Sequence, residues 1–223
     1  MSAGAAEFPV RGGIPRWIEA SISLLGLVAI SPLIALAMLA VRLSSPGPVF
    51  FRQQRMGRGG RPFTLLKLRS MRSDASGPAV TGRVDPRITP VGKWLRKTKL
   101  DELPQLWNVV RGDMSLVGPR PEVPRYANPA DPRWSRVLAV RPGITDPLTL
   151  RLRDEESLMP EAEAERERFY LEVLQPIKLN AYLEYLARRT AWSDVGVVLA
   201  TVVAVVRPGR GADPAEVLKT GRL

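Results

Sequence analysis

The hydrophobic pattern near the start of the chain is dominated by one uninterrupted apolar segment. Residues 20–41 are all uncharged, and 17 of these 22 residues are Ala, Val, Ile, Leu or Met. A straight helix of this length extends for about 33 Å, which matches the roughly 30 Å thickness of a bilayer's hydrocarbon core. The preceding residues 1–15 are rich in Gly, Ala and Pro. The pattern therefore predicts an irregular tail followed by a membrane-embedded helix.

Two features of this segment distinguish a bent helix from a straight one. Ser31-Pro32 lies at its middle, where proline removes a backbone donor and crowds the preceding turn. Basic residues flank both ends, namely Arg11 and Arg16 on one side and Arg42, Arg52, Arg55 and Arg58 on the other. Because positive charge collects on the cytoplasmic side, we expect both ends there, as in a re-entrant helix kinked at Ser31-Pro32. The alternative is an ordinary span that tolerates its proline.

After Ser44 the pattern changes to short segments that are separated by turn residues. Residues 49–51 and 63–68 flank the loop 57–62, which predicts a β-hairpin. The remaining segments are predicted as a loop at 73–90, short helices at 92–99 and 101–111, turns at 118–121 and 141–143, and longer helices at 161–174, 177–189 and 193–206.

Two details of the C-terminal helices follow from single residues. Pro176 is expected to break the helical pattern, and Ser193 or Asp194 is expected to cap the last helix. The apolar part of that helix, residues 195–206, extends for only about 18 Å, which is too short to span a bilayer. It is therefore expected to pack in the core or to lie at the membrane surface.

Composition narrows the chemistry that is available. The chain has no cysteine and no histidine, which excludes disulfides, thiolate or imidazole metal sites, serine–histidine triads and histidine bases. Lys and Arg number 33 against 22 Asp and Glu, a net charge of +11 that favours nucleic acid, anionic lipid or phosphorylated substrates. Nucleophilic and acid–base steps are left to carboxylates, lysines, tyrosines or hydroxyls.

The adjacent acids Asp101 and Glu102 stand at the expected start of a helix. One interpretation is structural, because Asp is a preferred N-cap and Glu in a first turn complements the helix dipole. The other is chemical, with one carboxylate attacking or binding a metal while its neighbour handles a proton. Basic residues crowd the nearby segments, namely Lys67, Arg69, Arg72, Arg96, Lys97, Lys99, Arg111, Arg120 and Arg125. Acids in such a basic field suit a Mg²⁺–diphosphate site, and neither a P-loop nor a dinucleotide motif is present.

Five motifs, in this order along the chain, resemble the monotopic phosphoglycosyl transferases, the bacterial sugar transferases that initiate glycan assembly on polyprenol phosphate. The motifs are Ser31-Pro32 and residues 45–53, 67–71, 96–105 and 112–122. With the segment pattern, this resemblance implies an α+β, mainly helical fold with a small β-hairpin, a re-entrant membrane helix and surface amphipathic helices. It implies a tail and membrane helix at 1–43 and a catalytic unit at 44–223, monotopic in the bacterial inner membrane and facing the cytoplasm.

The resemblance also implies residue roles. Asp101 would attack the sugar-linked phosphorus of a UDP-sugar and expel UMP, before polyprenol phosphate takes the sugar phosphate. Glu102 would be its acid–base partner, and Mg²⁺, bound partly through Asp101, would neutralise the diphosphate. Lys67 and Arg96 occupy positions that the family uses near the active site. The expected substrate-binding residues are Arg69, Arg111, Pro119, Arg120, Pro121 and Arg141.

One departure from the family pattern concerns the segment after Arg141-Pro142-Gly143-Ile144-Thr145. Family members usually continue with Gly and a Leu-Ala-Gln-Val-like run, whereas this chain has Asp146-Pro147. The identity of the sugar is left open for that reason. The acidic stretch 154–167 matches no motif and is expected to be a solvated helix face.

The expected partners are a UDP-sugar, polyprenol phosphate and the lipid of one leaflet, without nucleic acid; the sequence leaves open whether the chain forms a homo-oligomer. Two hypotheses from other classes compete with a transferase. The chain could be a membrane-anchored scaffold whose basic face binds anionic lipid, or an anchored nucleic-acid binder. The second lacks the usual binding modules and does not explain the apolar segment 20–41.

Overall fold

The computed structural model describes residues 12–74, 77, 80–82, 85–128, 130–153 and 155–207. Predictions for residues 1–11, including Arg11, for Asp154 and for the expected helix stop at Pro208-Gly209 lie outside this range. The helices are α1 (Arg16–Ser44), α2 (Pro90–Thr98), α3 (Gln105–Arg111), α4 (Pro132–Val137), α5 (Pro147–Arg151), α6 (Glu163–Phe169), α7 (Gln175–Arg188) and α8 (Ala191–Val206). The strands are β1 (Phe50–Met56), β2 (Pro62–Leu68), β3 (Ser115–Val117) and β4 (Gly143–Thr145). The fold is α+β and mainly helical, as predicted.

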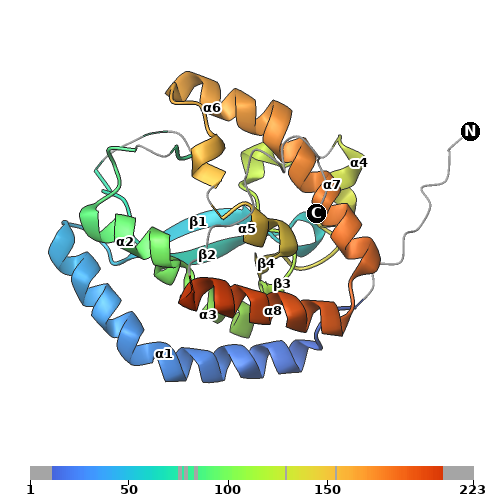
Figure 1. Cartoon of the computed structure of the whole chain (residues 1–223), viewed down its shortest axis with the longest axis horizontal. Helices are drawn as coiled ribbons and strands as arrows, with labels where there is room; N and C mark the ends of the chain where they lie inside the picture. The colour runs from blue at the N-terminus through green and yellow to red at the C-terminus, as the bar shows by residue number, and fades with distance from the viewer. Residues whose placement is uncertain are drawn as a thin grey trace, which may run out of the picture.

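Helix α1 is bent, and Figure 1 shows it as two arms that wrap one side of the fold. Pro32 lies inside it. Because proline has no N–H, it cannot bond to the carbonyl of Val28, four residues earlier. The hydroxyl of Ser31 donates to that carbonyl instead, at 2.8 Å. The predicted kink therefore has a local compensation for the hydrogen bond that it loses.

Both arms of α1 are attached to the rest of the fold. In the first arm, the Glu19 carboxylate accepts a hydrogen bond from the Leu116 backbone N–H at 2.9 Å. In the second arm, Val41 is buried with Leu68 and Leu95. Among the described residues, α1 is the helix whose length and composition allow it to cross a membrane. Large exposed apolar side chains cover its outer face, namely Trp17, Ile22, Leu24, Leu25, Val28, Leu33, Leu36, Leu39 and Leu43.

The predicted hairpin is confirmed, and its first strand is longer than expected. Strands β1 and β2 pair antiparallel over their whole length, from Phe50 opposite Leu68 to Met56 opposite Pro62. A second, parallel pair of strands, β3 and β4, was not predicted. It occupies the predicted turn 141–143 in part, because Gly143 begins β4. Strands of three residues carry too little periodicity to be recognised in a sequence.

Two helix predictions differ from the structure. The helix expected at 101–111 begins at Gln105, because residues 100–102 form a 3₁₀ turn that leads into Pro104. Pro176 does not break the helical pattern: α6 continues into α7 through a π-helical turn, Tyr170–Leu174. The wider turn accommodates the missing proline donor.

The cap of α8 is Thr190, which forms a reciprocal capping box with Ser193. Asp194, one of the expected caps, is fully buried instead and pairs with Arg189 at 2.8 Å. The inner face of α8 packs on the core through Val197 and Val198. Exposed apolar residues mark its outer face, namely Trp192, Val195, Leu199, Val202, Val203, Val205 and Val206. The inner face of α8 thus fits the expected packing in the core, and its exposed apolar face fits the expected position at a membrane surface.

Candidate functional site

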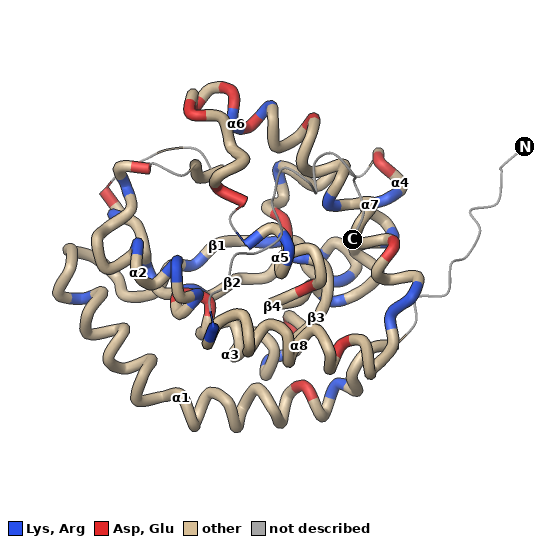
Figure 2. Tube along the Cα trace, viewed as in Figure 1, with Lys and Arg blue, Asp and Glu red and all other residues tan. Residues whose placement is uncertain are grey.

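A cleft of about 2130 Å³ gathers residues from the hairpin, α2, the loop after β3, α5 and α7. Basic side chains outnumber acidic ones along its walls. Figure 2 shows charged positions around β1, α2 and α5, whereas the middle of α1 is uncharged. Seven of the predicted site residues line this cleft, namely Lys67, Arg69, Arg96, Asp101, Glu102, Arg120 and Pro121.

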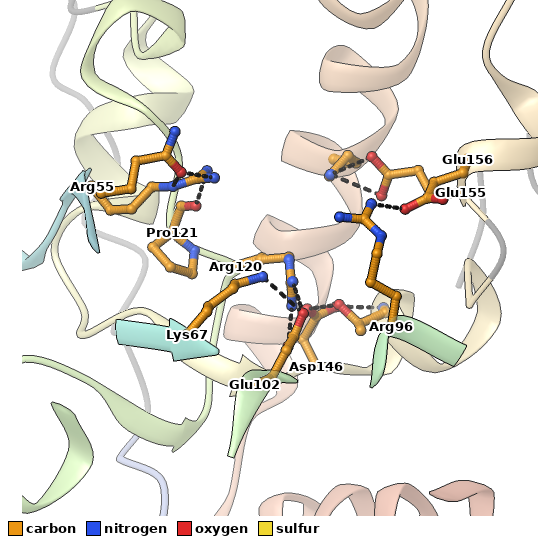
Figure 3. Close-up of polar contacts among 12 residues, drawn as sticks. Arg55, Lys67, Arg96, Glu102, Arg120, Pro121, Asp146, Glu155 and Glu156 are labelled. Atoms are coloured by element: carbon orange, nitrogen blue, oxygen red, sulfur yellow. Dashed lines mark hydrogen bonds and ion pairs between the residues drawn. The ribbon is translucent and has the colours of Figure 1, made fainter. Parts of the chain in front are cut away.

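Glu102 is the centre of an ion-pair network (Figure 3). Its Oε1 atom accepts from Lys67 Nζ at 3.0 Å and also from Arg120 Nη2, and its Oε2 atom accepts from Arg120 Nη1 at 3.2 Å. Burial opposes the charge, but Arg120 and Lys67 together hold the pKa of Glu102 well below its usual range. The same carboxylate raises the pKa of Arg120, while burial lowers the pKa of Lys67. Glu102 is therefore ionised in this state of the protein.

Asp101 has a different environment from its neighbour. Only 4% of its surface is exposed, and its Oδ1 atom has no hydrogen-bond partner. Burial raises the pKa of Asp101, and the charge of Lys67 opposes this shift. Because buried polar atoms are nearly always paired, this carboxylate oxygen is available to a ligand in the cleft. The capping interpretation is wrong, since Asp101 lies in the 3₁₀ turn before the helix begins.

The position of the acidic pair is fixed by contacts on both sides. After it, Asn108 of α3 accepts from the Leu66 N–H at 3.1 Å and donates to the Thr64 carbonyl at 2.8 Å, which ties α3 to β2. Before it, the backbone N–H of Lys99 closes α2 by donating to the carbonyls of Arg96 and Leu95. The turn that carries Asp101 is therefore held against the strand that carries Lys67.

Arg120 extends from a loop that two glycines bring close to β4. Gly118 N–H donates to Thr145 O at 3.0 Å, and Gly143 N–H donates to Pro119 O at 2.9 Å. A Cβ atom at Gly143 would lie 2.1 Å from the Gly118 nitrogen, so no side chain fits there. The loop after β3 is thus pinned by backbone contacts, which fix where Arg120 starts.

The departure at Asp146-Pro147 starts α5 as a helix cap. The buried Asp146 carboxylate accepts from the backbone N–H groups of Leu148 at 2.8 Å and Thr149 at 2.9 Å. Pro147 occupies the first turn, where its missing donor costs nothing. Since Thr149 and Arg151 of α5 line the cleft, the departure shapes one of its walls.

Three predicted arginines have other surroundings. Arg111 is exposed and pairs with Asp113 at 3.6 Å, and Arg141 Nε donates to Gly112 O at 3.0 Å. The structure does not bring these two to the cleft. Arg69 lines the cleft, but its Nη2 donates to the carbonyls of Val41 and Ser45, where it anchors the end of α1.

Part of the acidic stretch lines the cleft, which the sequence did not predict. Glu156 accepts from Arg96 Nη2, and Glu155 pairs with Lys178 at 3.1 Å. Figure 3 shows Glu155 and Glu156 beside the guanidinium group of Arg96. The expectation of a solvated face is wrong for Glu155 and Glu156, which lie in a 3₁₀ turn rather than in α6. No local pattern separates them from the exposed acids that follow.

The residues present fit a shared Mg²⁺ rather than a protein-built metal cage. Within the described ranges, no three or more carboxylates form a metal-binding group. A hard cation would require a carboxylate oxygen that has no other partner, and Asp101 Oδ1 is such an atom. Mg²⁺ typically uses one or two carboxylates and completes its shell with water and substrate phosphates. Asp101 thus fits as the protein's ligand to a Mg²⁺ that a diphosphate also binds.

The raised pKa of Asp101 predicts how the protein's stability depends on pH. The folded chain holds the proton of the Asp101 carboxyl group more tightly than the unfolded chain does. Protonated Asp101 therefore contributes to folding stability below the unfolded pKa of about 3.9, and this contribution is lost as pH rises through the folded pKa. Relative to Asp101→Asn, the wild-type protein should therefore lose stability as pH rises above about 4, and the difference should then level off. Thermal unfolding of both proteins between pH 4 and 8 tests this. A difference that does not change with pH would contradict it.

Comparisons with known proteins identify the family of the chain. A family model described as "Bacterial sugar transferase" matches residues 10–208. The chain is 40% identical over 181 residues to the UDP-glucose:undecaprenyl-phosphate glucose-1-phosphate transferase of Caulobacter vibrioides, a match that covers 79% of this chain and 63% of that protein. It is 36% identical over 205 residues to the protein of the same name from Xanthomonas campestris pv. campestris, covering 89% of this chain and 39% of that protein.

A third relative acts on another sugar. The UDP-N-acetylgalactosamine-undecaprenyl-phosphate N-acetylgalactosaminephosphotransferase of Aeromonas hydrophila is 40% identical over 142 residues, covering 61% of this chain and 34% of that protein. The chain thus spans less than two thirds of the length of each of these three relatives. The family model matches most of the length of this chain. The chain therefore belongs to the bacterial sugar transferases, the phosphoglycosyl transferase family that its five motifs indicated.

Proposed function

We propose that the chain transfers a sugar phosphate from a UDP-sugar to polyprenol phosphate, giving a polyprenol-diphosphate sugar and UMP. The observation that carries this proposal is the buried Asp101 carboxylate, whose Oδ1 atom has no partner in a strongly basic cleft. The printed names of the relatives support the substrate classes, because they combine UDP-sugars with undecaprenyl phosphate. Those names differ in the sugar, so the donor sugar of this chain has to be identified by testing a panel of UDP-sugars.

The reaction we propose has two half-reactions at Asp101. A carboxylate oxygen attacks the sugar-linked phosphorus, and the bond from phosphorus to the UMP oxygen breaks, with its electron pair leaving on UMP. An oxygen of polyprenol phosphate then attacks the same phosphorus, and the acyl-phosphate bond to Asp101 breaks. The carboxylate is restored, and no oxidant, reductant or further reactant is needed.

The surroundings of Glu102 narrow its proposed role. Since Arg120 and Lys67 hold its pKa low, Glu102 cannot act as a proton donor near neutral pH. The same low pKa makes it a weak base, and its main contribution is to hold Lys67 and Arg120 in place through two ion pairs. Positive charge fixed in this way is suited to the oxygens of a phosphoryl group, where negative charge is concentrated.

Mg²⁺, when bound through Asp101 and the substrate, would supply neutralisation of the diphosphate charge. The remaining contributions come from the chain itself. Lys67 and Arg120 are prearranged by Glu102, and Arg96 extends into the cleft from α2, where Glu156 now binds its guanidinium. A substrate phosphate would compete with Glu156 for that group.

We further propose that the protein enters a single leaflet, with both ends of α1 on the cytoplasmic side. Contacts at both arms support this topology: Glu19 is bonded to β3, and Val41 is packed against β2 and α2. Cysteines introduced at Gly12 and Pro46, in this cysteine-free chain, should both be labelled from the cytoplasmic side of inverted vesicles. Labelling from opposite sides would rule out the re-entrant arrangement. A cysteine in place of the exposed Asp74 serves as the control, because its labelling reports the orientation of the vesicles.

The scaffold and nucleic-acid hypotheses give different results in one assay. Purified protein in nanodiscs is incubated with UDP-sugars, polyprenol phosphate and Mg²⁺, and UMP is measured. We expect UMP from at least one sugar, and only when Asp101 is intact. Folded protein that releases no UMP with any sugar would favour a binding protein, and binding of random duplex with a steep salt dependence would favour the nucleic-acid hypothesis.

A further inference from the structure

Lys99 has an unusual backbone for a residue with a side chain. Its φ of 59° lies in the left-handed region, and the other positive φ values among the described residues belong to glycines. Glycine adopts this conformation freely at the end of a helix, whereas a side chain is strained there. The backbone N–H of Lys99 closes α2, which a glycine would do equally well. The backbone therefore does not explain why a lysine occupies this position.

Lys99 shares the cleft with the acidic pair. Lys99 lines the cleft and precedes Asp101 by two residues. It lines the cleft together with both carboxylates, and its backbone carbonyl accepts a hydrogen bond from the Glu102 N–H at 3.1 Å. A lysine on its flexible stem acts there as a movable point charge.

The neighbouring cations are already engaged by carboxylates of the chain. Lys67 and Arg120 pair with Glu102, and Arg96 pairs with Glu156. The side chain of Lys99 makes no hydrogen bond or ion pair with any other described residue. Of these four cations of the cleft, Lys99 is the one that a substrate phosphate can bind without displacing a protein carboxylate.

We propose that Lys99 binds the phosphoryl group that Asp101 attacks and remains with it through both half-reactions; this rests on the proposed function. Lys99 transfers no proton. Its ammonium group stabilises the negative charge on the phosphoryl oxygens, first as the bond to UMP breaks and again as the bond to Asp101 breaks. Because the same phosphoryl group reacts twice, both half-reactions depend on Lys99.

The test uses substitutions that separate the charge from the backbone. Lys99→Gly removes the charge and relieves the strained conformation, and Lys99→Asn removes the charge while tolerating that conformation. Lys99→Arg keeps the charge. Lys97→Asn is the matched control, since Lys97 also lines the cleft but lies in the ordinary backbone of α2.

Two rates are measured on the full chain in nanodiscs. Exchange of labelled UMP into UDP-sugar without acceptor reports the first half-reaction, and formation of polyprenol-diphosphate sugar reports the whole cycle. We expect Lys99→Gly and Lys99→Asn to lower kcat in both assays at least ~10-fold, with Lys99→Arg and Lys97→Asn close to wild type. Lys99→Gly should melt at or above the wild-type temperature.

The outcomes separate the two proposals. Unchanged rates in a stable Lys99→Gly protein would show that Lys99 only ends α2. Loss of transfer with normal exchange would show that Lys99 acts on the acceptor, polyprenol phosphate, instead. Equal losses in Lys97→Asn would show that any positive charge in this part of the cleft serves as well as Lys99. Each of these results would overturn the inference. Absence of exchange in the wild-type protein would count against the proposed function itself.

Discussion

Replacing Asp101 with Asn is expected to abolish both UMP exchange and sugar-phosphate transfer, by at least ~10³-fold, while leaving the protein folded. A carboxamide cannot form the acyl-phosphate, and the uncharged side chain is better suited to the buried site than the carboxylate. The measurement is UMP release beside thermal unfolding near pH 7, where the variant should melt at or above the wild-type temperature.

The control for this substitution is Asp74→Asn, which changes an exposed aspartate outside the cleft. It should alter neither rate nor stability noticeably. Substantial turnover by a folded Asp101→Asn protein would show that the reaction does not proceed through this carboxylate. It would also return the scaffold hypothesis to consideration.

Replacing Arg120 with Met is expected to have the second-largest effect, on activity and on stability together. It leaves the mostly buried Glu102 carboxylate with Lys67 alone. Breaking a buried pair is strongly destabilising, and the partial exposure of Arg120 reduces the expected loss to about 1–3 kcal/mol of unfolding free energy. Transfer should fall at least ~10²-fold, because a cation at the phosphoryl site is lost.

A second substitution separates these two effects. In Glu102→Gln/Arg120→Met, the uncompensated carboxylate is gone, so much of the unfolding free energy should return while activity stays low. Arg111→Met is the matched control, because Arg111 is 61% exposed in its side chain and lies outside the cleft. Full activity in Arg120→Met, or loss of activity in Arg111→Met, would contradict the placement of the phosphate-binding residues.

Long, strongly patterned elements were predicted well from the sequence. The apolar run gives α1, and the two short segments on either side of the loop 57–62 give the hairpin. The motifs identify Asp101 and Glu102, and the fold brings both into one cleft with Lys67. These predictions succeed because periodicity and local chemistry carry the information.

Features that depend on tertiary contacts were not predicted. Glu156 faces Arg96 only because the turn that carries it packs across the cleft, and nothing local distinguishes it from a solvated acid. The start of α3 was misplaced because the sequence does not reveal the 3₁₀ turn around Asp101. Arg111 was included because arginines near a motif look alike until the fold separates them.

The central claim is that Asp101 carries the sugar phosphate between the two substrates, and intact-protein mass measurement tests it most directly. The protein is incubated with Mg²⁺ and the preferred UDP-sugar, without polyprenol phosphate, and is quenched rapidly. We predict an added mass equal to one sugar phosphate, located on the peptide that contains Asp101, absent in Asp101→Asn and lost when polyprenol phosphate is added. Transfer by the wild-type protein with no such adduct, or an adduct that persists in Asp101→Asn, would contradict the account.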